Sequence, residues 1–242
     1  MDADWIIPAF VLIDTLMQRL GCQRDVRAQG PDSAIILIAV AAAKYFLNHH
    51  ERAGCVLREA HYRSGRIDIT RCNRRLQKLA DWLAFIATSL GEILLTGEVF
   101  VIDSLPVLVC RRVRARRCRK VRDLQYCGYC AAKKEKFFGW RLPVICTPSG
   151  APVSFQLLPA AFHDWPPVHE LAVILPSGAR LFGDKANNSA DDAASILAET
   201  GVRLIPVRRA HMQPHGWFVD EIELHDYRHT IETVNSQCEK MG

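Results

Sequence analysis

The hydrophobic pattern of this chain changes from a helical to a strand period near residue 97, and this change limits the folds open to it. Apolar residues from Leu76 to Ile93, spaced alternately three and four apart, predict one amphipathic helix with Thr70 as its N-cap. From Glu98 onward, short apolar runs rich in β-branched residues indicate strands. The sequence therefore predicts a helical region, 1–96, followed by an α/β domain, 97–242.

The second region alternates strands and helices in a definite order. A buried strand, 99–102, ends on Asp103, and two runs joined by Thr147-Pro148-Ser149-Gly150 predict a β-hairpin over 139–158. A helix (166–175), a strand that ends before Asp184 (179–183), a helix (189–200) and a strand (202–207) follow. The last helix carries Glu232 at the edge of its apolar stripe.

Asp103, Asp184 and Glu232 are candidates for one site because two of them end strands and the third lies on an amphipathic helix. Each has an ordinary alternative explanation, since an aspartate at a strand end is commonly a turn former or a helix cap. The three residues are far apart along the chain. Only tertiary folding can bring them together.

Several segments, in the same order, resemble the DDE domain of bacterial insertion-sequence transposases, most closely the insertion sequence 982 family. They are VFVIDSLPVLVCRRVRARRCRK, YCGYCAAKKEKFFGWRLPVICTPSGAPVSFQLLP, LFGDKA and YRHTIETVNSQ, and DITRCNRRLQKL resembles the segment upstream of that domain. The resemblance covers roughly residues 65–242. It implies a ribonuclease H-like α/β fold, a mixed sheet flanked by helices, behind an all-helical N-terminal region.

The resemblance also implies roles for individual residues. Asp103 and Asp184 match the two catalytic aspartates, Glu232 matches the catalytic glutamate, and Arg228 matches an arginine that contacts phosphate or orients that glutamate. Residues four apart share a helix face, which is consistent with the last pair. The three acids would hold two Mg²⁺ ions, with Mn²⁺ as a substitute, because hard oxygen ligands suit these cations and two such ions can support phosphodiester cleavage.

The expected function is transposition: cleavage of insertion-sequence ends in double-stranded DNA and their joining to target DNA, by a homo-oligomer assembled on the DNA. Two alternatives stay open from the residues, a nucleic-acid-binding remnant without catalysis and a ribonuclease H-like nuclease that does not join strands. Only ten residues follow Glu232, whereas relatives generally continue this helix. We therefore expect a domain truncated at its C-terminus, with weak or absent activity.

A basic run follows the first aspartate. It holds eight basic residues in twelve positions and no acid, namely Arg111, Arg112, Arg114, Arg116, Arg117, Arg119, Lys120 and Arg122. Removing these eight charges from the net charge of +5 leaves −3 for the rest of the chain. We expect this run to contact DNA phosphates. Arg74 and Arg75, near the start of the 70–93 helix, are weaker candidates because a solvated basic face is the commoner explanation. With the resemblance, they lead us to expect that the helical region, 1–96, binds DNA.

The chain has nine cysteines, which are possible metal ligands. Cys110, Cys118, Cys127 and Cys130 include one CxxC pair, but the other two lie eight apart, so the spacing argues against zinc and favours ordinary thiols.

The longest apolar run, 34–43, is about half of the roughly 20 residues that cross a bilayer, and the N-terminus begins with acidic rather than basic residues. We expect a cytoplasmic protein without membrane contact.

The basic run generates the first prediction. Replacing Arg114, Arg116, Arg117 and Arg119 by glutamine should weaken binding to all DNA sequences alike and flatten the slope of log K against log salt by about 0.9 per lost phosphate contact. Lysine at the same four positions keeps the charges and serves as the control. An unchanged slope in the glutamine variant would show that the run is only solvated.

Overall fold

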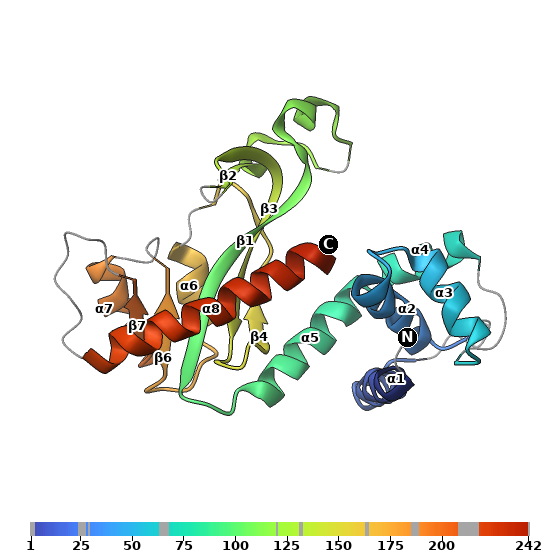
Figure 1. Ribbon diagram of the computed structural model, residues 1–242, viewed down its shortest axis with the longest axis horizontal. Coiled ribbons are helices and arrows are strands. Elements are labelled where there is room, and N and C mark those ends of the chain that lie inside the picture. Colours follow the sequence, from blue (N-terminus) through green and yellow to red (C-terminus); the bar gives the residue numbers. More distant parts are fainter. Residues whose placement is uncertain are drawn as a thin grey trace. The chain divides into compact units, whose positions relative to one another are not determined.

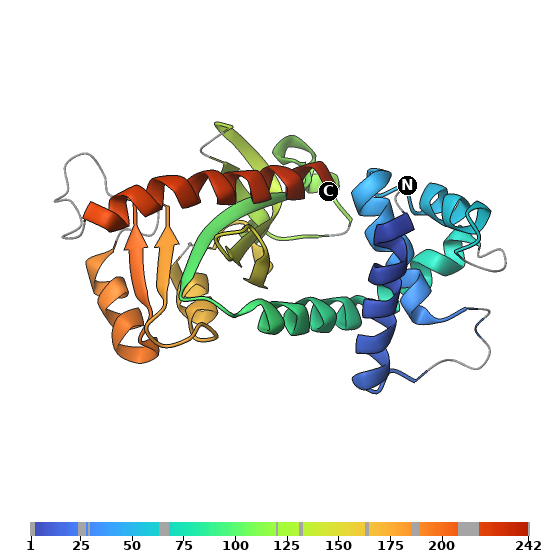
Figure 2. The same cartoon turned by 60° about the horizontal axis from the view of Figure 1, so that its bottom comes forward.

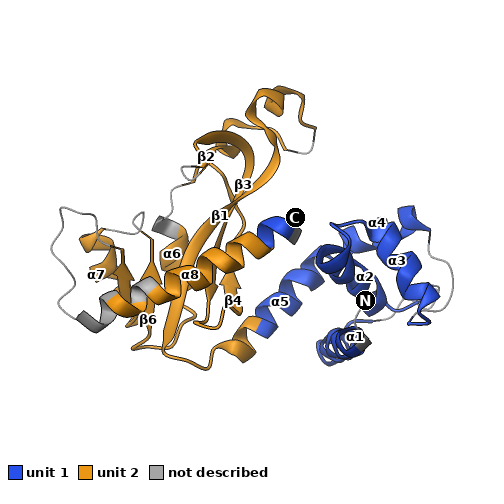
Figure 3. Ribbon diagram, in the orientation of Figure 1, with its two compact units in different colours: residues 1–90, 238–242 blue, residues 91–237 orange. Residues whose placement is uncertain are grey.

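The computed structural model describes residues 3–23, 28, 30–62, 68–119, 121–130, 133–162, 165–184, 189–207 and 218–241. These residues form two compact units, Met1–Leu90 with Cys238–Gly242 and Gly91–Gln237 (Figure 3). Of the candidate site residues, Lys120 lies outside the described ranges. No helix within these ranges is both long and apolar enough to cross a membrane.

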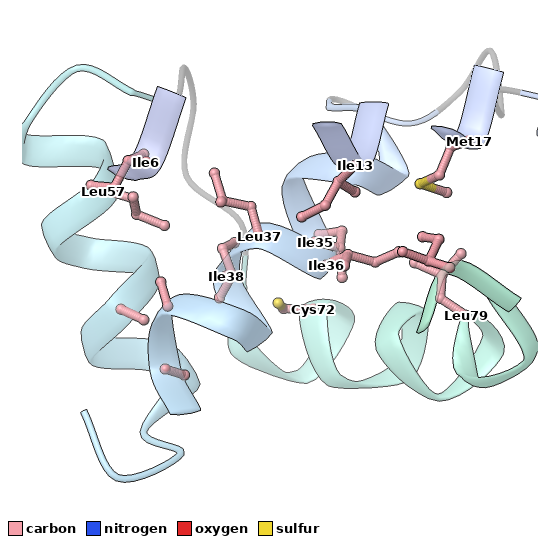
Figure 4. Packing of buried hydrophobic residues seen from close by; sticks show 14 residues of the cluster. Ile6, Ile13, Met17, Ile35, Ile36, Leu37, Ile38, Leu57, Cys72 and Leu79 are labelled. Atoms are coloured by element: carbon pink, nitrogen blue, oxygen red, sulfur yellow. The ribbon is translucent and has the colours of Figure 1, made fainter. Parts of the chain in front are cut away.

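The first unit is helical, as the sequence predicts. It contains α1 (Ala3–Arg19), α2 (Asp32–Tyr45), α3 (His50–Glu59), α4 (Ile69–Lys78) and most of α5 (Ala80–Leu94). The core is built largely on α2, whose Ile35, Ile36 and Ile38 are almost fully buried. Figure 4 shows Ile13, Leu57 and other side chains of the neighbouring helices gathered around them. Burial of such side chains is the main force that stabilises a helical unit of this kind.

Two expectations about this unit are wrong. The apolar stripe lies on two helices, α4 and α5, because the chain turns at Leu79 between them. The N-cap of α4 is Asp68 rather than Thr70, since the Asp68 carboxylate accepts a hydrogen bond from the Arg71 amide at 3.1 Å. An aspartate is at least as good a cap as a threonine, so the helix begins at the first of these two residues.

The second unit is built on a seven-stranded mixed sheet (Figure 1). Its strands are β1 (Val99–Arg111), β2 (Cys127–Cys130), β3 (Glu135–Cys146), β4 (Pro152–Phe155), β5 (Leu158–Pro159), β6 (Arg180–Gly183) and β7 (Arg203–Pro206). The order is β2-β3-β1-β6-β7, and β4 and β5 also pair with β3. β1, β6 and β7 run parallel, whereas β3 is antiparallel to its partners.

Helices cover both faces of this sheet. α6 (Trp165–Ala172) and α7 (Ala190–Thr200) pack on the face that carries Phe100, Ile102 and Leu181, in one buried cluster. α8 (Phe218–Met241) crosses the opposite face (Figure 2). Alternate residues of a strand point to opposite faces, so the sequence determines which side chains meet α8. This architecture confirms the predicted α/β class with a mixed, ribonuclease H-like sheet behind a helical region.

The first strand differs from its prediction, because it does not end on Asp103. β1 continues to Arg111, and the segment from Asp103 onward pairs with β3. Beyond Val101, no described strand pairs with the other side of β1, so β1 forms an edge there. An edge tolerates Pro106, which has no amide hydrogen to donate. Asp103 therefore lies within a strand, where that strand stops pairing with β6.

The predicted hairpin is confirmed as β3 and β4, with β5 added to β3. The Gly150 amide donates to the Thr147 carbonyl at 2.9 Å and closes the turn. Gly150 has a φ of +85°, and a Cβ there would lie 3.2 Å from Cγ2 of Val234 on α8. The turn therefore approaches α8 closely, and glycine satisfies both the backbone angle and the space.

This turn provides a stability prediction. Gly150→Ala should lower the free energy of unfolding by about 1 to 2 kcal/mol through backbone strain alone, and by more because its Cβ presses on Val234. Gly178→Ala is the matched control, since Gly178 has a φ of +87° with nothing within 4 Å of the added Cβ. Chemical denaturation of both variants measures the difference. Equal losses would contradict the contact with α8.

Candidate active site

Asp103 follows the last β1 residue that pairs with β6 by two positions, and Asp184 directly follows β6. β1 and β6 pair in register from Val99 opposite Arg180 to Val101 opposite Phe182. The same register, continued by two residues, places Asp103 opposite Asp184, which directly follows β6. Asp103 is half-buried, and Asp184 is exposed. The fold thus brings the two predicted aspartates to one edge, although 81 positions separate them in the chain.

Three contacts hold α8 on the face that these aspartates share. At its start, Arg180 on β6 forms an ion pair with Glu223 at 2.6 Å. One helical turn further, the Tyr227 ring packs on Phe182 with 5.3 Å between ring centroids. Ile231 and Val234 are buried on the inner side of α8, and the Asn235 side chain donates a hydrogen bond to Asp103. The helix predicted to carry the glutamate therefore lies across β6 and the part of β1 that holds Asp103.

The Asp103 carboxylate accepts hydrogen bonds from the strand and from α8. The Ser104 amide donates to Oδ1 at 2.7 Å, and the Asn235 side chain donates from Nδ2 to Oδ2 at 2.5 Å. Asn235 is a site residue that sequence reasoning missed. The signal available was its position three residues after Glu232, because residues three apart are neighbours on a helix surface.

Glu232 lies on the outer side of α8, where its carboxylate accepts a hydrogen bond from Arg228 Nε at 3.0 Å. Both side chains are about half exposed, at 54% and 49%. The two residues that the resemblance pairs thus form an exposed ion pair one helical turn apart. Within the described ranges, no three His, Cys, Asp or Glu side chains lie close enough together to hold one metal ion.

The basic run forms the end of β1 and the turn beyond it. Arg112–Arg117 is a 3-10 helix, η1, beside the ends of β1 and β3. The seven arginines of the run are exposed, and none forms an ion pair with an acidic side chain that the structure describes. In the helical unit, Arg74 is exposed, whereas Arg75 is bound to Asp32 at 2.5 Å and to the Gly30 carbonyl at 2.9 Å. Arg75 thus links α4 to the start of α2.

All nine cysteines are free thiols. Partial burial and the neighbouring Cys118 thiol raise the pKa of Cys110, and Arg114 opposes this effect.

The docking of α8 is testable by double-mutant cycles. The pair Arg180 and Glu223 is about 70% buried on each side, so replacing both by alanine, singly and together, should give a coupling of about 1 kcal/mol. The exposed pair Arg228 and Glu232 is the control, for which we expect about 0.3–0.5 kcal/mol. A negligible coupling for Arg180 and Glu223 would contradict the placement of the start of α8 on β6.

Comparisons with known proteins identify the family of the second unit. A family model described as Transposase DDE domain matches residues 95–242, more than half of the chain and all of the segment that carries the three acids. No curated protein and no solved structure matches the chain. A domain of this kind has DNA as its partner and the chemistry of the nucleases and transposases. The chain therefore belongs to the family of proteins with a transposase DDE domain.

Proposed function

We propose that this chain is a DDE transposase that cleaves double-stranded DNA at insertion-sequence ends and joins those ends to target DNA. The proposal extends to the insertion sequence 982 family, on the segments that resemble it, and to action as a homo-oligomer on DNA. The single observation that carries it is the register of β1 and β6. This register brings two aspartates to one sheet edge beneath a helix that carries a glutamate.

The donor chemistry of this edge suits a hard divalent cation. Carboxylate and amide oxygens are the ligands that Mg²⁺ prefers, and Asp103, Asp184, Glu232 and Asn235 offer such oxygens. A pair of bound Mg²⁺ or Mn²⁺ ions supplies activation of the attacking hydroxyl and stabilisation of the leaving oxygen. Asp103 and Asp184 would hold the cations from the strands. Glu232 would join them from α8, with Arg228 setting its orientation.

The basic run gives the DNA a second contact, next to the end of the β-strand that carries Asp103. Arg111 follows Asp103 by eight positions along β1, so the two are at most about 26 Å apart at a rise of about 3.3 Å per residue. That span equals roughly eight base pairs at about 3.4 Å each. We propose that the exposed arginines bind phosphates within this distance of the scissile bond, which fits their lack of acidic partners among the described residues.

One observation favours a DNA-binding protein without catalysis. The Glu232 carboxylate is bound to Arg228 and is half exposed, and it does not join the aspartates in a three-acid cluster within the described ranges. For the chain to cleave DNA, Glu232 must move toward Asp103 and Asp184 when cations and DNA bind. Metal-dependent cleavage separates the two functions, and recovery of joined products separates a transposase from a nuclease that only cuts.

Substitution of the acids is the decisive experiment. Asp103→Asn, Asp184→Asn and Glu232→Gln should each reduce Mg²⁺-dependent cleavage of end-containing DNA by more than about a hundredfold, since even the hydrogen-bond partners of metal ligands are typically worth 10- to 100-fold. Combining them should add little, because one missing ligand already disables the site. Cleavage and joining are measured together on a labelled duplex.

The matched control is Asp191→Asn, an exposed carboxylate on α7. It should cleave like the unsubstituted chain. Cleavage by Asp103→Asn within tenfold of the unsubstituted chain would refute the assignment. DNA binding without any metal-dependent cleavage by the unsubstituted chain would identify a binding protein instead.

A further inference from the structure

The side chain of Asn235 has an unusual environment for the inner face of α8. Its Nδ2 donates to Asp103 Oδ2 at 2.5 Å, across 132 positions of sequence. Its Oδ1 is buried, and no donor among the described residues reaches it. A buried acceptor without a partner costs free energy, so most such atoms in proteins are satisfied by a group of the protein, by water or by an ion.

The orientation of this amide follows from chemistry. An ionised carboxylate only accepts hydrogen bonds, so the amide presents its NH₂ group to Asp103. The carbonyl oxygen must then point away from that contact, as the unpartnered Oδ1 does. Turning the amide over would bring two oxygens together and would repel. Asn235 therefore holds Asp103 with one end and offers a hard oxygen beside it with the other.

The packing of α8 on the sheet does not explain why position 235 carries an amide. Ile231 and Val234, on either side of the same stripe, are already buried, at 4% and 6% exposure. An apolar residue at 235 would extend that stripe and would leave no unpartnered oxygen. Glu232, three residues earlier, faces Arg228 instead of Asp103. Asn235 is thus an α8 side chain that touches the aspartate of β1.

We propose that Asn235 is a positioning residue that holds Asp103 and presents its amide oxygen to the divalent cation bound there. The inference rests on the proposed function, because it assigns this oxygen to the same cation site. Asparagine carbonyl oxygens are established ligands of hard cations. The three side chains that meet at this edge would then be Asp103, Asp184 and Asn235, with Glu232 joining them when DNA binds.

Mn²⁺ binding to the full chain without DNA tests this role apart from activity. The free-ion signal of Mn²⁺ in electron paramagnetic resonance gives the dissociation constant. Asn235→Leu should raise that constant about tenfold or more, the size expected when a residue that supports a metal ligand is lost. Gln237→Leu is the matched control, because Gln237 is an exposed amide on the same helix, and it should leave the constant unchanged.

A second variant keeps the test valid if Asn235→Leu fails to fold. Asn235→Asp places a carboxylate against that of Asp103, so without cation its melting temperature should fall below that of the unsubstituted chain. With Mn²⁺ the melting temperature should rise by more than it does for the unsubstituted chain, because the cation relieves the repulsion. A purely structural role would lower the melting temperature of the variant but leave its response to Mn²⁺ unchanged.

The outcomes separate the inference from the function on which it rests. If the unsubstituted chain binds Mn²⁺ and Asn235→Leu binds it equally well, the role of Asn235 is wrong and the metal-dependent function stands. An Asn235→Asp variant whose melting temperature responds to Mn²⁺ no more than that of the unsubstituted chain also overturns the inference. If the unsubstituted chain binds no Mn²⁺, the proposed function fails and the inference fails with it.

Discussion

The parallel pairing of β1 with β6 determines where the acidic residues of this domain lie. Because Val101 pairs with Phe182, the next residues of the same parity are Asp103 and Asp184. The same pairing aligns Arg180 and Phe182 with the face that receives α8, through Glu223 and Tyr227. A shift of one residue in this register would turn these side chains to the face covered by α6 and α7. Site and helix docking therefore depend on one set of backbone hydrogen bonds.

β1 pairs with β6 at its start and with β3 along the rest, and it links Asp103 to the basic run. Its first three residues pair with β6, whereas the segment from Val101 to Arg111 pairs with β3. Asp103 lies where pairing with β6 ends, so its carboxylate has room for partners from α8. The far end of the strand carries the exposed arginines of η1. A single rigid strand thus sets the spacing between the proposed cutting site and the proposed phosphate contacts.

Local patterns predicted the elements well, and tertiary contacts account for what they missed. The alternation of strands and helices, the Thr147–Gly150 turn and the Ser189 cap of α7 follow from residues close together in the chain. The continuation of β1 past Asp103 depends on pairing with β3, which no local signal gives. Asn235 was missed for a related reason, since its place three residues after Glu232 does not show that it contacts Asp103, 132 positions away. Arg75, a weaker candidate for DNA contact, has Asp32 as its partner, and a residue 43 positions away leaves no local signal.

The central claim is that divalent cations bind at the sheet edge formed by Asp103 and Asp184, beneath α8. Localised cleavage of the protein backbone tests it most directly. Fe²⁺ in place of Mg²⁺, with ascorbate and peroxide, produces hydroxyl radicals that cut the chain near the bound ion, and mass spectrometry locates the cuts. The account predicts cuts close to residues 103 and 184 and in α8 near 232–235, all suppressed by excess Mg²⁺. Cuts confined to other segments, or a pattern that Mg²⁺ does not suppress, would contradict it.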